Sequence, residues 1–179
     1  TSYDYGAAID ETRRLRDKAA TMKQLGQFIQ AVMPLTQMIK GAPTKASSPA
    51  IKIYHNVNPQ TQTHFYFAMH EPSSAVTHDA FTFALSTADG DYTVPKQGTL
   101  RINGQDAKIL LAGYNLERQR LVYSTSELQT HLQLGATDLA LFYGREGEDA
   151  ETLLRYSSLP SIEVLAGDVS STFDAKTGD

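Results

Sequence analysis

The stretch Thr99-Leu-Arg-Ile-Asn-Gly-Gln-Asp-Ala-Lys-Ile-Leu110 carries the clearest local signal for the fold. Two β-prone runs flank Asn103-Gly104, a dipeptide that adopts the positive φ angles of a tight hairpin turn without strain. Apolar and polar residues alternate in the first run, which is the period of a strand with one buried face. The stretch therefore predicts a β-hairpin whose two strands pair across Asn103-Gly104.

The same period of two continues on both sides of this hairpin, from Ala50 almost to the end of the chain. Short β-rich runs alternate there with turn signals, which is typical of an antiparallel sandwich or of stacked hairpins. Beyond the hairpin, the expected strands are residues 51–54, 64–70, 81–85, 91–94, 120–124, 138–143, 162–165 and 169–173, and a turn is expected at 174–179. We therefore predict a mainly β chain built as an antiparallel β-sandwich or hairpin domain.

Before residue 40 the chain follows the period of an α-helix. Apolar residues recur at spacings of three and four from Ala19 to Met33, and polar residues occupy the opposite face. Pro34 is expected to end this helix within about a turn. Proline, glycine and serine then mark residues 41–50 as a linker or an extended crossing segment.

The composition narrows the classes of function. The chain has 179 residues, 16 Lys and Arg against 20 Asp and Glu, a formal net charge of -4 and no Cys. This acidic balance argues against a nucleic-acid partner, because nucleic-acid-binding surfaces carry a basic excess. Without cysteine neither thiol catalysis nor a disulfide is possible, and no apolar run is long enough for a membrane partner to be expected. The length suits one domain, or one domain with a piece of another.

Four histidines lie close together in the sequence and suggest a metal site: His55, His64, His70 and His78. In one strand, however, six residues separate His64 from His70, which is roughly 20 Å at about 3.3 Å per residue. The two side chains therefore cannot share an ion unless the chain folds back. We interpret them as the polar face of a half-exposed strand, with Phe65, Phe67 and Met69 on the core face. No metal ion and no cofactor is expected.

Other catalytic signatures are absent from the sequence. No Gly-x-Ser-x-Gly elbow accompanies a serine, and no glycine-rich phosphate loop occurs. Glycosidase chemistry requires two carboxylates that face each other, whereas the acidic residues here fall mainly in expected turns and on the helix. The loop at 144–148 is interpreted as a turn. Only Asp4, which lies between Tyr3 and Tyr5, has the surroundings of a site.

Several motifs together carry a resemblance to a known family. Thr1-Ser-Tyr-Asp-Tyr-Gly-Ala-Ala-Ile9, followed by Met22-Lys-Gln-Leu-Gly-Gln-Phe28, resembles the end of the catalytic barrel in β-galactosidases of glycoside hydrolase family 35. Later segments resemble the second domain of the large microbial and fungal members, in order and at similar spacing: His64-Phe-Tyr-Phe67, Tyr92-Thr-Val-Pro95, 99–109, 121–127, and Leu141-Phe-Tyr-Gly-Arg-Glu-Gly147. Residues 171–179 look like a hairpin cut at its turn.

The resemblance implies a division of the chain. Residues 1–40 would be the C-terminal strand and helix of a (β/α)8, or TIM-barrel, catalytic domain, and residues 41–50 a linker. Residues 51–179 would be the second domain, which is all-β, partly immunoglobulin-like and C-terminally truncated. On this reading the chain is an excised piece of a longer polypeptide.

The resemblance also implies a function. Family members hydrolyse terminal β-D-galactosyl residues with retention, using two glutamates on earlier barrel strands, one of them in an Asn-Glu pair. This sequence has no Asn-Glu pair, so no catalytic residue is expected and the chain alone should be inactive. By the same resemblance Tyr5 would contribute to the galactose site, with Tyr3 as second choice.

The expected role is to support the catalytic barrel. The expected partners are the rest of the same polypeptide and, through the missing barrel, a β-galactoside substrate. We expect an extracellular or periplasmic location. Two other roles fit the same residues: a galactoside-binding β-sandwich module, and a purely structural spacer.

Overall fold

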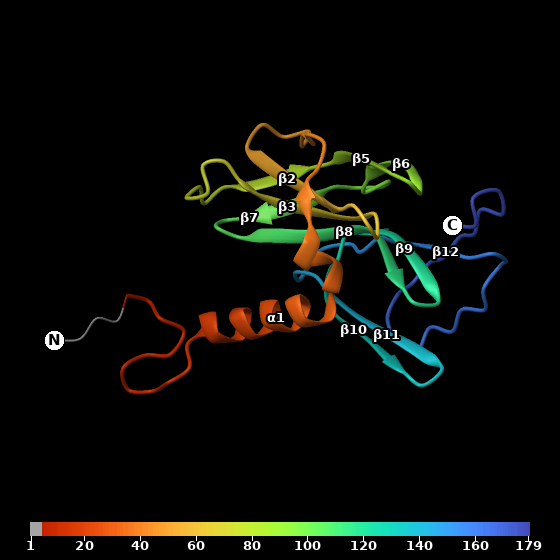
Figure 1. Ribbon diagram of the computed structural model, residues 1–179. Helices are drawn as coiled ribbons and strands as arrows, with labels where there is room; N and C mark the ends of the chain where they lie inside the picture. The colour runs from red at the N-terminus through yellow and green to blue at the C-terminus, as the bar shows by residue number, and fades with distance from the viewer. Residues whose placement is uncertain (1–4) are drawn as a thin grey trace.

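A six-stranded antiparallel sheet forms the centre of the molecule (Figure 1). The computed structural model describes residues 5–179. The strands of this sheet, in spatial order, are β1 (Ile39–Lys40), β2 (Ile51–Asn58), β3 (Thr63–His70), β8 (Ala107–Leu116), β9 (Gln119–Ser124) and β12 (Thr152–Arg155). Every neighbouring pair is antiparallel, as the period of two predicts.

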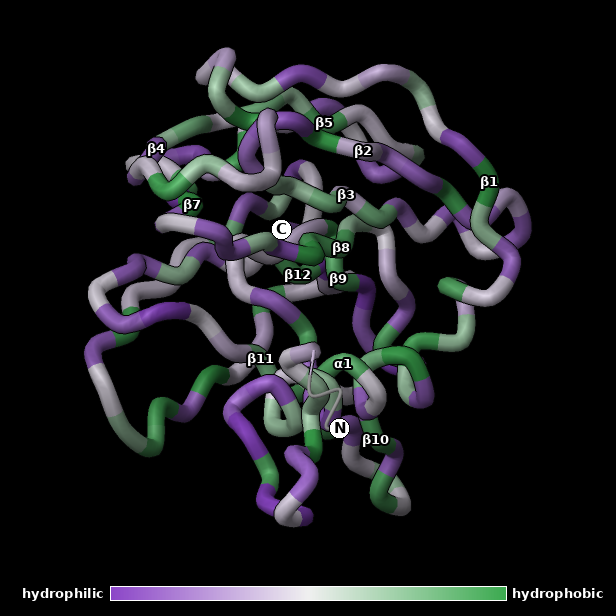
Figure 2. Tube along the Cα trace, turned by 90° about the vertical axis from the view of Figure 1, so that its left-hand side faces the viewer, coloured by the Kyte–Doolittle hydropathy of each residue, from purple (hydrophilic) through white to green (hydrophobic). Residues whose placement is uncertain are grey.

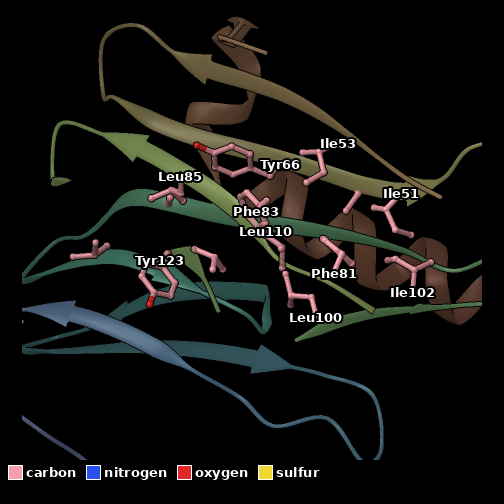
Figure 3. Close-up of a cluster of buried hydrophobic side chains, with 14 residues drawn as sticks. Ile51, Ile53, Tyr66, Phe81, Phe83, Leu85, Leu100, Ile102, Leu110 and Tyr123 are labelled. Carbon is pink, nitrogen blue, oxygen red and sulfur yellow. The ribbon is translucent and has the colours of Figure 1, made fainter. Parts of the chain in front are cut away.

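Two short strand pairs cover one face of this sheet. They are β4 (His78–Phe81) with β7 (Leu100–Asn103), and β5 (Phe83–Thr87) with β6 (Gly90–Val94). Figure 3 shows their apolar side chains packed against those of the central sheet, such as Tyr66 and Leu110. This first core also contains Phe81, Phe83, Ile102 and Val122, all nearly inaccessible to solvent.

The opposite face of the sheet is covered by a helix and a hairpin. Helix α1 (Asp17–Ala31) is followed by the short 3-10 helix η1 (Met33–Gln37), and the hairpin pairs β10 (Glu127–Leu134) with β11 (Thr137–Tyr143). Phe28 and Val32 pack there against Phe65, Leu111 and other buried residues of a second core. Figures 1 and 2 show from two directions that β8 and β9 lie between this layer and β5.

The expected fold class is confirmed at the level of the whole chain. Among residues 5–179 the structure is mainly β and antiparallel, and one α-helix precedes the strands. That helix begins at Asp17 and ends at Ala31, close to the predicted bounds of 19 and 33, with Pro34 at the start of η1. The proposed divisions at residues 40 and 50 stay predictions. No helix among residues 5–179 is long and apolar enough to cross a membrane.

The predicted pairing across Asn103-Gly104 is wrong. The turn itself forms, since Gly104 has a φ of 60° and the Asp106 amide donates to the Asn103 carbonyl at 3.3 Å. However, β7 pairs with β4, whereas β8 pairs with β3 and β9. Local turn chemistry specified the turn, but burial of β7 against the central sheet decided its partner.

The strand predictions near the end of the chain are also wrong. Residues 162–165 and 169–173 form no strand, whereas β10 and β12 were not predicted. The turn after residue 173 is present, because the Gly178 amide donates to the Asp174 carbonyl at 2.8 Å. Residues 157–173 pair with no strand among residues 5–179, and most of their apolar side chains are exposed.

The histidines of β3 are buried, which corrects the half-exposed reading. His64 and His70 are only 7% and 2% exposed, because the β4–β7 and β5–β6 pairs cover the face of the sheet on which they lie. Phe65 does face a core, namely the second one beneath α1. A sheet covered on both sides has no polar face, and the sequence of one strand does not show how many layers cover it.

Gly113 changes which way the side chains of β8 point. Ala112 belongs to the first core, and Tyr114 belongs to the second, although residues two apart on a regular strand share a face. Gly113 lies between them with a φ of 64°, which reverses the alternation. This glycine therefore turns Tyr114 and Leu116 toward the second core, whereas regular alternation would place them on the side of Leu110 and Ala112 in the first core.

Candidate functional site

The predicted sugar-contacting tyrosines are placed only in part. Tyr3, like Asp4, lies outside the described residues. Tyr5 is 85% exposed in the segment that precedes α1, and this segment lies at the outer end of the helix, away from the sheet (Figure 1). The role of Tyr5 and Tyr3 in a galactose site stays a prediction.

The loop after β11 anchors a partly buried network of charges, called here the Arg145 cluster. Arg145 Nη1 donates to Glu127 Oε2 at 2.7 Å, while its Nε donates to Asp106 Oδ2 at 2.8 Å. Hydrogen bonding to Asp106 raises the pKa of Arg145, although burial opposes this shift. Burial raises the pKa of Asp106, but the bonds from Arg145 outweigh it and leave that pKa lowered. The guanidinium and the Asp106 carboxylate are therefore charged and paired, and Glu127 contacts the same guanidinium.

Lys108 and Glu148 complete the cluster. Lys108 is 1% exposed, and its Nζ lies 2.8 and 2.9 Å from the two carboxylate oxygens of Glu148. Glu148 Oε2 also accepts the Arg145 backbone amide at 2.9 Å. The cluster therefore joins the loop at 144–148 to β8 and β10, and its carboxylates are occupied in ion pairs rather than free for proton transfer.

The second network surrounds Asp89 at the turn between β5 and β6. Asp89 lies 3.0 Å from Arg120 and 3.3 Å from Arg155, and Arg155 also pairs with Asp179 at 2.8 Å. Burial raises the pKa of Tyr92, whose hydroxyl donates to Asp179 Oδ2 at 3.2 Å. This network fastens the turn at 174–178 onto β9 and β12.

A cavity of about 450 Å³ opens between residues 42–44, the central sheet and the β5–β6 pair. Its lining includes the rings of His55 and Tyr66 from the central sheet. Ser86, Asp91 and Tyr92 line it from the β5–β6 pair. Aromatic rings beside hydroxyl and carboxylate groups provide apolar contact together with hydrogen-bonding capacity. The lining of this cavity therefore offers both kinds of contact to a small polar ligand.

His55, which lines this cavity, forms a hydrogen-bonded pair with His64. His55 Nδ1 lies 2.8 Å from the Ala42 carbonyl oxygen, and His55 Nε2 lies 2.9 Å from His64 Nδ1. The His55 ring also stacks on Tyr66, with ring centroids 4.5 Å apart. Within residues 5–179 no three His, Asp or Glu side chains form a potential metal site. Because His55 Nε2 and His64 Nδ1 face each other at hydrogen-bonding distance, we interpret the pair as hydrogen-bonded rather than metal-binding.

Sequence reasoning missed both charge networks, although one signal was present. Lys108 shares the strand parity of Leu110 and Ala112, which lie in the first core. A lysine at a core position requires a buried anion, and that partner comes from residue 148, forty positions away. Only the folded chain identifies it.

Comparisons with known proteins agree on one family. A family model described as "Beta-galactosidase, domain 2" matches residues 35–178. The chain is similar to proteins named "Probable beta-galactosidase B": it is 33% identical to that of Aspergillus niger over 90% of this chain and 16% of the relative. The relative from Penicillium rubens is 29% identical, over 93% of this chain and 17% of its own length. The chain thus spans less than a fifth of these relatives.

Proposed function

Because this chain belongs to the family of β-galactosidase second domains, we propose that it is the non-catalytic second domain of a larger β-galactosidase. The whole enzyme would hydrolyse terminal β-D-galactosyl residues with retention. This part would support its catalytic portion by packing against it. The occupied carboxylates of the Arg145 cluster support a structural rather than a catalytic role.

The observation that carries the supporting role is an apolar stripe along the outer flank of α1. Met22, Leu25 and Ile29 of α1, continued by Met33 at the start of η1, are between 43% and 64% exposed, and they recur at helical spacing. A helix normally buries one apolar stripe, and α1 already buries Phe28 against the sheet. The exposed stripe, defined by these four residues, is therefore a second apolar face that suits a protein contact.

We assign that contact to the rest of the same polypeptide. The relatives are more than five times longer than the part that matches this chain, so most of each relative lies outside it. A domain joined covalently to its partner needs only a modest apolar face, because the linkage keeps the local concentration of the partner high. The stripe on α1 meets this requirement.

The test uses the two parts of the enzyme as separate polypeptides. The chain described here and the remaining polypeptide are mixed, and their co-elution is measured together with hydrolysis of a chromogenic β-galactoside. Ile29→Lys should weaken assembly at least tenfold, because a charge would enter the apolar contact. Gln30→Lys, also exposed on α1, is the matched control and should assemble normally. Equal assembly of both variants contradicts the proposal, as does turnover by this chain alone.

A galactoside-binding module is the second candidate, favoured by the cavity beside Tyr66 and Tyr92. Titration of the chain with galactose, followed by NMR, would then move the signals of Ser86 and Asp91. No shift at millimolar galactose rejects this candidate. Such silence, together with normal assembly of Ile29→Lys, would leave the role of a spacer.

A further inference from the structure

The segment between β1 and β2 is attached to two different parts of the molecule, and the cavity opens between them. In its second half, the Ser47 amide donates to the Thr82 carbonyl, just before β5, at 2.8 Å. At its start, the Gly41 amide donates to the His55 carbonyl of β2 at 2.9 Å. Residues 42–44 therefore pass from β2 to the β5–β6 pair, and they line the cavity on their way.

The opposite side of the cavity is a free edge of β5. One edge of β5 pairs with β6, and among residues 5–179 no strand pairs with the other edge, which meets only an isolated bridge between Ala46 and Phe83. Because residues 42–44 diverge toward β2, residues 84–86 line the cavity rather than pairing with a neighbouring strand. An unpaired strand edge presents backbone N–H and C=O groups. The cavity therefore has hydrogen-bonding groups from the main chain as well as from side chains.

Tyr66 adds a buried hydroxyl that has no partner in the protein. The residue is only 1% exposed, yet no group among residues 5–179 forms a hydrogen bond with its hydroxyl. Tyr66 lines the cavity, and Figure 3 shows its hydroxyl oxygen on the side of Leu85, another lining residue. Burial raises the pKa of this phenol, so at neutral pH it keeps its proton and can both donate and accept. Since a buried hydroxyl normally has a hydrogen-bond partner, we expect a ligand to supply one.

The other polar side chains of the cavity favour a neutral ligand that is rich in hydroxyl groups. The lining has one carboxylate, that of Asp91, and three aliphatic hydroxyl groups, from Thr44, Ser86 and Thr93. No described Lys or Arg lines the cavity, and the two ring nitrogens of His55 already face other groups at 2.8 and 2.9 Å. An anion would therefore meet a carboxylate without a compensating cation. A sugar, by contrast, can donate its hydroxyl groups to Asp91 and exchange hydrogen bonds with the remaining groups.

We propose that this cavity binds one neutral galactosyl unit, which is held by the Tyr66 hydroxyl and by the Asp91 carboxylate. The proposal rests on the galactoside-binding candidate given under the proposed function, and it adds the two residues that would hold the sugar. The volume of about 450 Å³ accommodates one sugar ring together with water. The supporting role of α1 does not depend on this cavity.

Calorimetric titration of the chain with D-galactose tests the proposal. Tyr66→Phe removes only the hydroxyl and should weaken binding about fivefold, which corresponds to the loss of one neutral hydrogen bond. Asp91→Asn should weaken binding about tenfold, because a charged acceptor is lost. Tyr54→Phe is the matched control, since Tyr54 is exposed on β2 and does not line the cavity, and it should bind as the wild type does. Absence of binding at millimolar galactose overturns the proposal, as does wild-type binding by either cavity variant.

Thermal unfolding separates a hydroxyl that faces a ligand from one that stabilises the fold. Because the Tyr66 hydroxyl bonds no described group, Tyr66→Phe without galactose should change Tm by less than about 2 °C. A larger fall would show that the hydroxyl has a partner within the protein, and it would overturn the assignment to a ligand.

The assembly assay keeps this proposal distinct from the supporting role. Tyr66→Phe should assemble normally with the remaining polypeptide, whereas Ile29→Lys should bind galactose as the wild type does. Failure of galactose binding together with weakened assembly of Ile29→Lys would reject the sugar site and leave the supporting role intact. Normal assembly of Ile29→Lys together with the expected losses in Tyr66→Phe and Asp91→Asn would reject the supporting role and uphold the sugar site.

Discussion

Replacement of Gly113 by alanine should destabilise the domain far more than the same change at an exposed glycine. At residue 113 an added Cβ would lie 2.7 Å from the Gln62 carbonyl oxygen and 3.0 Å from Arg120 Nη2. Gln62 has a φ of 55° in the turn between β2 and β3, so its carbonyl is already held in an unfavourable conformation. Moving it to make room would disturb the turn and the Arg120–Asp89 pair.

The expected cost has two parts. A left-handed conformation costs alanine about 1–2 kcal/mol relative to glycine, and relieving overlap inside a packed region costs about 1–3 kcal/mol. Gly113→Ala should therefore lose about 3 kcal/mol, which lowers the Tm of a domain of this size by about 9 °C. Gly98→Ala is the control, because Gly98 has a φ of 74° but open space around it, so only the first part applies.

The measurement is thermal unfolding followed by circular dichroism at pH 7, with urea unfolding as a second determination. The chain has nine Tyr and no Trp, so tyrosine fluorescence gives an independent signal. Gly98→Ala should lower Tm by about 4 °C, which corresponds to the conformational part alone. If Gly113→Ala and Gly98→Ala lose the same stability, close packing does not require Gly113 and the reasoning is refuted.

Three further variants test other parts of the structure. Glu148→Gln should cost about 3 kcal/mol because it leaves Lys108 charged and buried, whereas adding Lys108→Met should restore most of that loss; no recovery in urea unfolding would contradict this account. Phe65→Ala should lower the free energy of unfolding by about 4 kcal/mol, because Phe65 is buried in the second core. A loss as small as that of Val76→Ala, at an exposed residue, would contradict this prediction. Stability should also fall with acid: His64 has a pKa lowered by burial to about 4, below the value of about 6.5 in unfolded chains, so the unfolded state binds more protons between these two values. With solvent screening the loss from pH 6.5 to pH 4 should be about 2 kcal/mol, and a profile identical in His64→Phe would exclude His64 as its source.

As with the fold, only part of the candidate site could be predicted from the sequence. The carboxylates of residues 127 and 148 are visible in the sequence, but their pairing with Arg145 and Lys108 joins segments far apart in the chain. The histidine pair likewise requires β2 and β3 to lie in register, with Val57 opposite His64. Residue types could suggest charge or metal chemistry, whereas only distances show that these groups are structural pairs.

By itself, the sequence determined the local features of this protein. The period of the apolar residues predicted α1 and most of the strands, and Asn103-Gly104 predicted a turn, because backbone conformation and one-sided burial depend on residues close in the chain. Tertiary structure decided the partner of β7, the burial of His64, and the reversal at Gly113 that turns Tyr114 toward the second core. The physical reason is that these features depend on which surfaces meet across the sheet, and burial on both of its faces is a property of three layers together rather than of any single strand.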